Sequence, residues 1–317
     1  MAILSKAHFY DEAAAFKHVE AVLWPQGSVC PHCGSVEKHY KLEGVRSKAS
    51  KKNPEGVERH GLYKCAACRS QFTVRIGTIF EESHLPLHIW LQAIHLMCSS
   101  KKGVSAHQLH RTLEVTYKSA WFLAHRIREA MKPATGGMIG GFGKIVEADE
   151  TFVGTKPGFK RQRGVTHKMK VLSLVERGGA IRSFRIPMLS RKGIEQIIRE
   201  NVHPASRIMT DTAAYYRKPL LGFQGHETVN HEQEEYVRGE VYTNTLEGFF
   251  SVFKRGMRGV YQHCAEKHLH RYLAEFDFRY SNRIAVGKND ESRAGKMLAG
   301  TVGKRLTYRR TGEHAGA

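Results

Sequence analysis

Four cysteines, arranged as two Cys-x-x-Cys pairs, constrain the N-terminal part of this chain more than any other feature of its sequence. The pairs are Cys30-Pro-His-Cys33 and Cys65-Ala-Ala-Cys68. Structural zinc takes four ligands in a tetrahedron, and each Cys-x-x-Cys turn supplies two of them. Residues 63–65 and 71–74, on either side of the second pair, have the composition of short strands. The pattern predicts a zinc ribbon with a structural Zn²⁺, since a site closed by four cysteines has no open position for catalysis.

Other features of this region leave alternatives for the ligands. Three histidines lie near the pairs and are alternative zinc ligands or surface residues: His32, His39 and His60. Thirty-one residues separate Cys33 from Cys65, which is more than usual in a ribbon, and the lysines in this insert indicate a solvated basic loop. The remaining cysteines, Cys98 and Cys264, lie in apolar stretches of helical pattern and are expected to be buried thiols.

The charge of the chain points to a polyanionic partner. Fifty Lys and Arg residues stand against 30 Asp and Glu residues, which gives a net charge of +20. Nucleic acid is the expected partner of such a protein, although a basic ribosome-associated factor has the same property. The N-terminus lacks the pattern of a signal peptide, and no apolar run is long enough to cross a bilayer. We therefore expect a cytoplasmic protein without a membrane partner, whose paired cysteines bind metal rather than form disulfides.

A helical region follows the cysteine pairs. Apolar residues recur at helical spacing in residues 87–99, 106–113 and 117–131, with a short turn between the last two stretches. A short helix, a tight turn and a longer helix are typical of a helix-turn-helix, whose second helix enters the major groove of DNA. In that interpretation Tyr117 and Lys118 face the groove, and Arg126 binds a DNA phosphate. A plain helical bundle between two domains fits the same pattern, and the basic charge favours DNA binding.

Residues 142–283 alternate between strand-like and helix-like stretches. The expected strands are residues 144–153, 168–176, 181–188, 207–211 and 226–230. The expected helices are residues 193–201, 213–221, 244–257 and 268–280. Three strands, then alternating helices and strands, fit the ribonuclease-H-like fold, in which helices pack on a mixed sheet. The expected fold class is multidomain α+β: a zinc ribbon and helix-turn-helix, then a ribonuclease-H-like mixed α/β catalytic core.

Three acids occupy informative places in this order. Asp149 lies on the first strand, Asp211 at the end of the fourth, and Glu247 in the first turns of the helix at 244–257. Such positions can meet at one edge of the sheet. Carboxylates are suitable ligands for Mg²⁺ or Mn²⁺, and two such ions can stabilise both oxygens of an in-line displacement at phosphorus. Lys254, seven residues after Glu247, faces the same side of the helix and is expected to bind substrate phosphate.

Each acid also has a simpler explanation. Asp211 is equally well a helix cap, and Glu247 a surface residue. Asp149 has acidic neighbours, Glu147 and Glu150, and any of the three fits a solvated strand edge. The inference of a catalytic site therefore depends on the joint order and spacing of the acids.

Basic residues accompany the acids. Residues 155–170 contain six Lys or Arg residues and no acid, and a loop of this kind after the first strand can follow a DNA backbone. The basic residues expected to contact DNA outside the helical region are Lys160, Arg161, Arg163 and Arg255.

Several segments, taken together, resemble one known family. They are CPHC, YKCAACRSQFTVRIGTIFE, VEADETFVG, MTDTAAYY, YTNTLEGFFSVFKRGMRGVY and KHLHRYLAEFDFRY. With these segments the chain resembles the DDE transposases of bacterial insertion sequences, in the group with an N-terminal zinc ribbon, from about residue 16 to residue 283. The resemblance implies a ribonuclease-H-like core, a divalent metal, and cutting and joining of DNA at terminal inverted repeats.

The same resemblance bears on the metal ligands. Carried over by position, the acids are Asp149, Asp211 and Glu247. Some relatives use Asn as the third ligand, and Asn244 lies three residues before Glu247. We choose Glu247, because a carboxylate brings charge to a dication, and interpret Asn244 as the N-cap of the helix.

The sequence thus predicts four regions and one principal function. The regions are a zinc-ribbon DNA-binding region at 1–84, helix-turn-helix-like helices at 85–133, a catalytic domain at 142–283 and a basic, partly disordered tail at 284–317, with a glycine-rich linker at 133–141. The expected function is a transposase acting on double-stranded DNA as a homo-oligomer on paired element ends. Two alternatives are a non-catalytic DNA-binding regulator and a ribonuclease-H-like nuclease that cuts without strand transfer.

Overall fold

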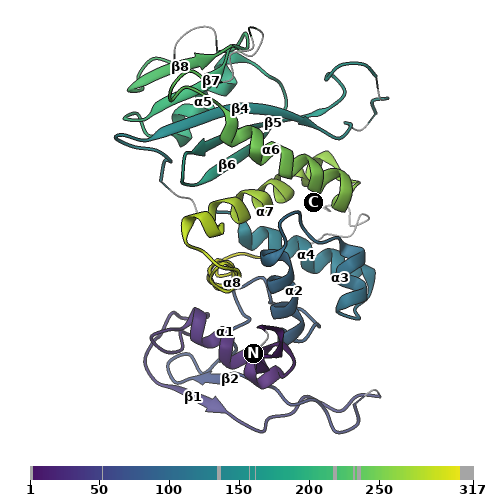
Figure 1. Cartoon of the computed structure of the whole chain (residues 1–317). Helices are drawn as coiled ribbons and strands as arrows, with labels where there is room; N and C mark the ends of the chain where they lie inside the picture. The colour runs from purple at the N-terminus through teal and green to yellow at the C-terminus, as the bar shows by residue number, and fades with distance from the viewer. Residues whose placement is uncertain are drawn as a thin grey trace, which may run out of the picture. The chain divides into compact units, whose positions relative to one another are not determined.

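The computed structural model describes residues 3–51, 53–133, 137–156, 158–160, 162–216, 220–230, 233 and 237–307 (Figure 1). Contacts within the chain divide it into two compact units, each made of separate stretches of sequence. Unit 1 comprises Met1–Cys98, Ala106–Ala130 and Ala294–Ala317, and unit 2 comprises Ser99–Ser105 and Met131–Arg293. Over the described residues, no helix has the length and apolar character needed to span a membrane.

The zinc-ribbon part of unit 1 is a small antiparallel sheet next to a helix. Its strands are β1 (His39–Leu42), β2 (Leu62–Cys65) and β3 (Gln71–Phe72), in the order β1-β2-β3. Tyr63 and Phe72 pair across β2 and β3 and stack at 5.6 Å between ring centroids, and Trp24 packs edge-on against both. Trp24 ends α1 (Glu12–Leu23), which Asp11 caps by accepting a hydrogen bond from the Ala14 amide. The predicted strands around the second cysteine pair are confirmed.

Three further helices belong mainly to unit 1: α2 (Leu87–Ser99), α3 (Ala106–Thr112) and α4 (Tyr117–Met131). Their bounds agree with the sequence-based prediction to within one residue. The carboxylate of Glu12 in α1 accepts hydrogen bonds from the backbone amides of Leu87 and His88 at 2.7 and 3.0 Å. These amides begin α2, where amide groups lack partners within the helix, so Glu12 fixes the start of α2 against the start of α1.

The prediction of a basic, partly disordered tail at 284–317 missed a helix. Residues Asp290–Ala299 form α8, which buries Met297 and Leu298. After α8, the Gly303 amide donates to the Gly77 carbonyl at 2.8 Å, and Lys304 Nζ donates to the Ala130 carbonyl at 2.9 Å. The basic composition of this segment predicts a partly disordered tail, but Met297 and Leu298 of α8 pack into the protein. Residues 308–317, including the end of the predicted basic stretch, lie outside the described residues.

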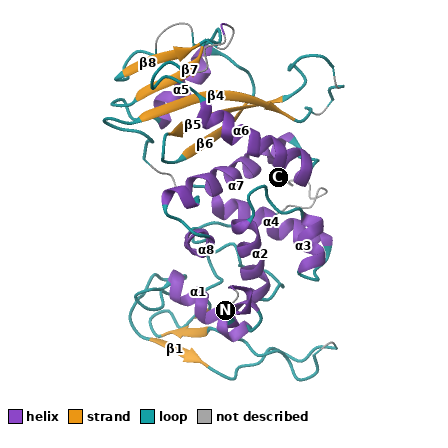
Figure 2. Cartoon of the chain, in the orientation of Figure 1, coloured by secondary structure: helices purple, strands orange, loops and turns teal. Residues whose placement is uncertain are grey.

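Unit 2 is built around a mixed five-stranded sheet in the order β6-β5-β4-β7-β8 (Figure 2). The strands are β4 (Ile145–Val153), β5 (Met169–Glu176), β6 (Ile181–Ile186), β7 (Arg207–Asp211) and β8 (Gly225–Val229). Strands β4, β5 and β6 form an antiparallel meander, whereas β7 and β8 run parallel to β4. The sequence predicted all five strands and the α+β class.

Helices cover both faces of this sheet. They are α5 (Arg191–Asn201), α6 (Asn244–Gly256) and α7 (Leu269–Ser281), with short helical turns at Met257–Tyr261, Glu266–His268 and Ile284–Val286. Side chains alternate between the faces of a strand. On β4, Val153 packs in a core with α6 and α7, whereas Val146 and Ala148 pack in a core with α5. Odd-numbered residues of β4 thus face α6, and even-numbered residues face α5.

One helix of the prediction is absent from the described residues. Residues 213–216 form a turn rather than the start of a helix at 213–221, and residues 217–219 lie outside the described part of the chain. Within this turn Tyr216 is buried with Ile194 and Ile198 of α5. Its ring therefore serves the core from a loop, which helical periodicity cannot distinguish from a helix over so short a stretch.

Candidate active site and zinc site

The four paired cysteines of unit 1 form one cluster. Their Sγ atoms all lie within 4.8 Å of one another, and the Cys30–Cys68 and Cys33–Cys65 pairs are each 3.7 Å apart. A tetrahedron with Zn–S bonds of about 2.3 Å has sulfurs about 3.8 Å apart. The donor set and its spacing therefore fit a structural Zn²⁺. The alternative ligands lie outside this cluster: His32 is within hydrogen-bonding distance of the Gln71 carbonyl, and His39 of Ser28 Oγ.

We expect purified protein to contain about one zinc per chain, and Cys65→Ser to lose it and unfold the ribbon, because metal binding and folding are coupled in small sites of this kind. Cys264→Ser, which changes a thiol outside the cluster, is the matched control and is expected to retain zinc. Elemental analysis and circular dichroism measure both effects. A zinc-free protein with a stable ribbon, or a disulfide between Cys30 and Cys65, would contradict this assignment.

Two acids of unit 2 meet because their strands are parallel neighbours. Strand β4 pairs with β7 up to Glu147 and Met209. Asp149 and Asp211 each lie two residues further along, and therefore on the same face of the sheet as that last pair. The Asp149 carboxylate accepts a hydrogen bond from the Glu150 amide, and the Asp211 carboxylate accepts one from the Ala213 amide. The sequence-based expectation that these acids share one edge of the sheet agrees with this arrangement.

A third carboxylate, that of Glu150, lies with these two acids, although its position in the sequence did not predict this. Carboxylate oxygens of Asp149, Glu150 and Asp211 all lie within 4.8 Å of one another. Burial, and then the charge of Asp211, raise the pKa of Asp149 to about 7. Burial, and then the charges of Asp149 and Asp211, raise the pKa of Glu150 to about 8. Acids crowded in this way raise one another's pKa, and their hard oxygen donors fit Mg²⁺ or Mn²⁺.

The expected partners from α6 lie near this acidic centre. The Glu247 charge contributes to raising the pKa of Asp149, and the Lys254 charge acts in the opposite direction. Glu247 is exposed in the first turn of α6, and its carboxylate is outside the group of three. Burial lowers the pKa of Lys254, as do the nearby charges of Arg258 and Lys168. The structure thus brings Glu247 and Lys254 within electrostatic reach of Asp149.

Asn244 has a different place from the one expected. It is the first residue of α6, and the N-cap position belongs to Thr243. The interpretation of Asn244 as the helix cap is therefore wrong by one residue. Sequence propensity does not separate Thr from Asn here, since both residue types are favoured N-caps.

A buried ion pair connects β4 to the start of α6. The Glu147 side chain is 0% exposed and accepts hydrogen bonds from Arg177 Nε at 2.6 Å, Thr245 Oγ1 at 2.7 Å and the Leu246 amide at 3.1 Å. Arg177 also donates to the carbonyls of Glu240 and Tyr242, both at 2.7 Å. Glu147 is thus not a solvated edge acid. It holds the first turn of α6, which carries Glu247, against the strand that carries Asp149.

The residues expected to contact DNA differ in exposure. Tyr117 and Lys118 are exposed at the start of α4, as are Lys160 and Arg163 after β4 and Arg255 on α6. Arg161 lies outside the described residues. Arg126 is only 4% exposed, donates to the Glu81 carbonyl at 2.7 Å and lies over the rings of Trp90 and Phe122. This is a correction: Arg126 points into the protein because its place on the helix faces α2, and it does not offer its charge to a DNA backbone.

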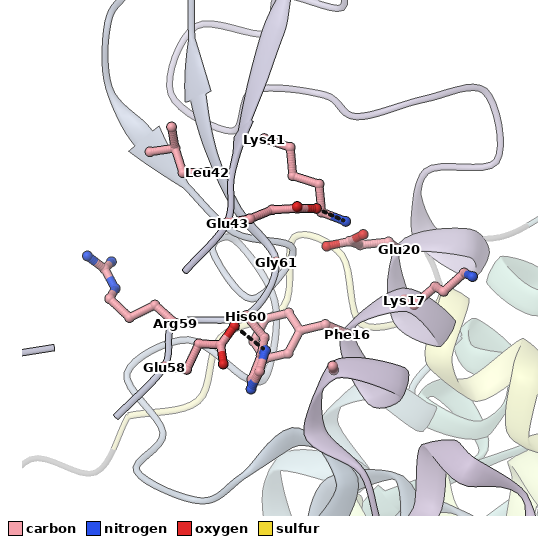
Figure 3. Close-up of a pocket in the computed structure, with 11 residues that line it drawn as sticks. Phe16, Lys17, Glu20, Lys41, Leu42, Glu43, Glu58, Arg59, His60 and Gly61 are labelled. Atoms are coloured by element: carbon pink, nitrogen blue, oxygen red, sulfur yellow. Dashed lines mark ion pairs between the residues drawn. The ribbon is translucent and has the colours of Figure 1, made fainter. Parts of the chain in front are cut away.

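Unit 1 also contains a pocket of about 240 Å³ beside the ribbon (Figure 3). Phe16, Lys17 and Glu20 of α1 line one side, and the strand β1 and residues 58–61 line the other. Acidic and basic side chains alternate around it, with ion pairs between Lys41 and Glu43 and between His60 and Glu58. Asp149, Asp211 and Glu247 of unit 2 do not line this pocket, and its mixed charge favours no single ligand class.

The chain is similar to known proteins over both the cysteine cluster and the acidic centre. Residues 139–281 match the ISXO2-like transposase domain, and residues 10–71 match the transposase zinc-ribbon domain. The chain is 26% identical over 299 residues to an uncharacterized protein in transposable element ISH50 of Halobacterium salinarum, covering 86% of this chain and 91% of that protein. A chain of the Mos1 strand transfer complex aligns over 66% of this chain and 74% of its own length, at 14% identity and with a TM-score of 0.26.

Proposed function

This chain belongs to the insertion-sequence transposases with an N-terminal zinc ribbon, and from that premise we propose that it is a DDE enzyme. In this proposal it binds the terminal inverted repeats of its element, cuts the DNA there and joins the ends to a target. The observation that carries the proposal is the placement of Asp149 and Asp211 on neighbouring parallel strands, with Glu247 and Lys254 of α6 within electrostatic reach. The strand order β6-β5-β4-β7-β8 supports a ribonuclease-H-like core.

In the proposed reaction, the acids hold the metal and the chain positions the DNA. Mg²⁺ or Mn²⁺, when bound by Asp149, Asp211 and Glu247, would supply activation of the attacking oxygen and neutralisation of the leaving oxygen at phosphorus. Lys254 lies two helical turns after Glu247 on the same face of α6 and would bind the phosphate to be attacked. The Glu147–Arg177 ion pair would keep the start of α6 in register with β4.

Binding of double-stranded DNA is assigned to exposed basic residues of both units. The net charge of +20 provides attraction to the phosphate backbone. Tyr117 and Lys118 at the start of α4 would read bases in the major groove, and the loop after β4 would follow the backbone. Because two element ends must be cut and joined together, we propose that the protein acts as a homo-oligomer on paired ends.

The test is an assay with a labelled element end, a target plasmid and Mg²⁺ or Mn²⁺. A transposase produces cut ends and also covalent end–target products. A nuclease of the same fold produces only cut ends, and a regulator binds the end without producing either. Recovery of joined products supports the proposal, whereas cutting alone, under conditions where ends and target are both bound, would contradict it.

The DNA-binding role of α4 has its own expected result. Affinity of the full chain for an element end should fall steeply as salt rises, because binding phosphates releases counterions. Lys118→Ala should reduce the preference for the terminal repeat over random DNA, because Lys118 is exposed at the start of α4. Competition binding at fixed salt measures both.

Lys48→Ala, which removes an exposed lysine from the basic insert of the ribbon, is the control. It should weaken binding to both DNAs by a similar factor. If Lys118→Ala leaves the preference for the terminal repeat over random DNA unchanged, α2–α4 form a structural bundle rather than a sequence-specific DNA-binding module.

A further inference from the structure

We infer that Glu150 is an additional ligand of the metal site, and that Asp149, Glu150 and Asp211 together hold a first divalent cation without Glu247, beside the hydroxyl of Tyr216. This inference rests on the proposed function, since it concerns the same metal-dependent site. It adds a ligand that the three-acid pattern of the family does not include. It also divides the site into a part formed within the sheet and a part contributed by α6.

The position of the Glu150 carboxylate is the first observation. Glu150 is an even-numbered residue of β4, so alternation places its side chain on the sheet face opposite that of Asp149. Its carboxylate oxygen nevertheless lies within 4.8 Å of carboxylate oxygens of Asp149 and Asp211. Its Oε2 atom is buried and has no hydrogen-bond partner among the described residues. A buried carboxylate oxygen without a donor is unfavourable unless the group is protonated or a cation compensates its charge.

Tyr216 supplies a second observation. Its side chain is 1% exposed, and its hydroxyl is buried without a hydrogen-bond partner among the described residues. The hydroxyl lies close enough to the Glu150 carboxylate to interact with it, and the charges of Asp149 and Asp211 also act on it, but no hydrogen bond of normal geometry joins it to a described residue. Buried tyrosine hydroxyls normally have a partner. A cation that keeps some of its water molecules would provide one for Tyr216 as well as for Glu150.

Glu247 differs from Glu150 in its exposure and in the position of its carboxylate. It is exposed, and its carboxylate lies outside the group of three. We therefore assign it to a step after the first cation has bound, when DNA brings phosphate oxygens to the site. The sheet residues alone then determine the affinity of the DNA-free protein for its first cation.

The test is a titration of the full chain with Mn²⁺ in the absence of DNA, in which electron paramagnetic resonance measures free Mn²⁺. Glu150→Gln keeps the size of the side chain and should weaken Mn²⁺ binding by more than about 10-fold, the lower bound for losing even an outer-shell partner. Tyr216→Phe should weaken it less. Glu247→Gln should bind as wild type, and so should Glu200→Gln, which changes an exposed acid of α5.

Folding is checked by the thermal midpoint without metal, where Glu150→Gln should be at least as stable as wild type because it removes like-charge repulsion. If Glu150→Gln binds Mn²⁺ like wild type while Asp149→Asn does not, the inference fails and the proposed function stands. If Glu247→Gln weakens binding as much as Glu150→Gln, the division of the site is wrong. If Asp149→Asn and Asp211→Asn both bind like wild type, the proposed function itself fails.

Discussion

Glu247→Gln is expected to abolish cutting and joining of element ends while leaving binding of those ends intact. Glutamine keeps the shape of the side chain but removes the charge that a second dication requires. The loss should exceed about 100-fold, the upper range for residues that only support a metal ligand. Because Glu247 is exposed on α6, the variant should fold normally. End-labelled DNA separates the two readouts, with product formation on denaturing gels and binding by mobility shift.

Asn244 provides the comparison within the same helical turn. Asn244→Ala changes an exposed residue that is not the N-cap, so it should alter stability by no more than about 0.5 kcal/mol and should retain cutting and joining. If Glu247→Gln is active and Asn244→Ala is folded but inactive, then Asn244 rather than Glu247 is the third metal ligand.

Glu147→Gln is expected to have the largest effect on stability among single substitutions near the site. The substitution leaves Arg177 without its carboxylate and places an amide N–H₂ group among donors. Removing one partner of a buried ion pair typically costs about 3–5 kcal/mol. Urea denaturation followed by circular dichroism gives the change in the free energy of unfolding, and hydrogen exchange of the Leu246 amide reports release of the start of α6.

An exposed ion pair supplies the control for this prediction. Glu195 pairs with Arg199 on the surface of α5, and Glu195→Gln should cost less than about 1 kcal/mol. If Glu147→Gln costs no more than Glu195→Gln, the buried pair does not hold α6 to β4. Catalysis should also fall in Glu147→Gln, because the turn that carries Glu247 loses its attachment to the strand of Asp149.

Much of the fold was predictable because strong patterns are local. Alternation and helical spacing predicted β4 to β8 and α2 to α7, and the composition around the second cysteine pair predicted β2 and β3, whereas α1 and β1 were not predicted. The prediction failed at residues 213–216 and 290–299. In the first, an apolar and aromatic stretch packs Tyr216 into the core from a turn. In the second, basic residues concealed the apolar side of α8, which buries Met297 and Leu298. Both outcomes depend on packing against segments distant in sequence.

The candidate site was predictable in part for the same reason. Asp149 and Asp211 follow from strand order, because the ends of parallel neighbours meet at one edge. Glu150 and Glu147 adjoin Asp149 in the same strand, and alternation alone assigns Glu150 to the opposite face. Only the fold shows that Glu147 is paired with Arg177, 30 residues away, and that Glu150 reaches the acids. Arg126 likewise lies at a plausible DNA-binding position but is buried against Trp90.

The return of the chain to unit 1 after residue 293 has a consequence for synthesis on the ribosome. Chains emerge from the N-terminus and fold progressively as they are made. Here the backbone carbonyls of Gly77 and Ala130 accept hydrogen bonds from Gly303 and Lys304. Both donors are translated only after the five-stranded sheet of unit 2, which carries Asp149 and Asp211. The segment around Gly77 and the end of α4 therefore complete their contacts only after residue 304 has been made. A chain that stops before α8 lacks these partners, so complete packing of unit 1 is restricted to chains that also carry Asp149 and Asp211.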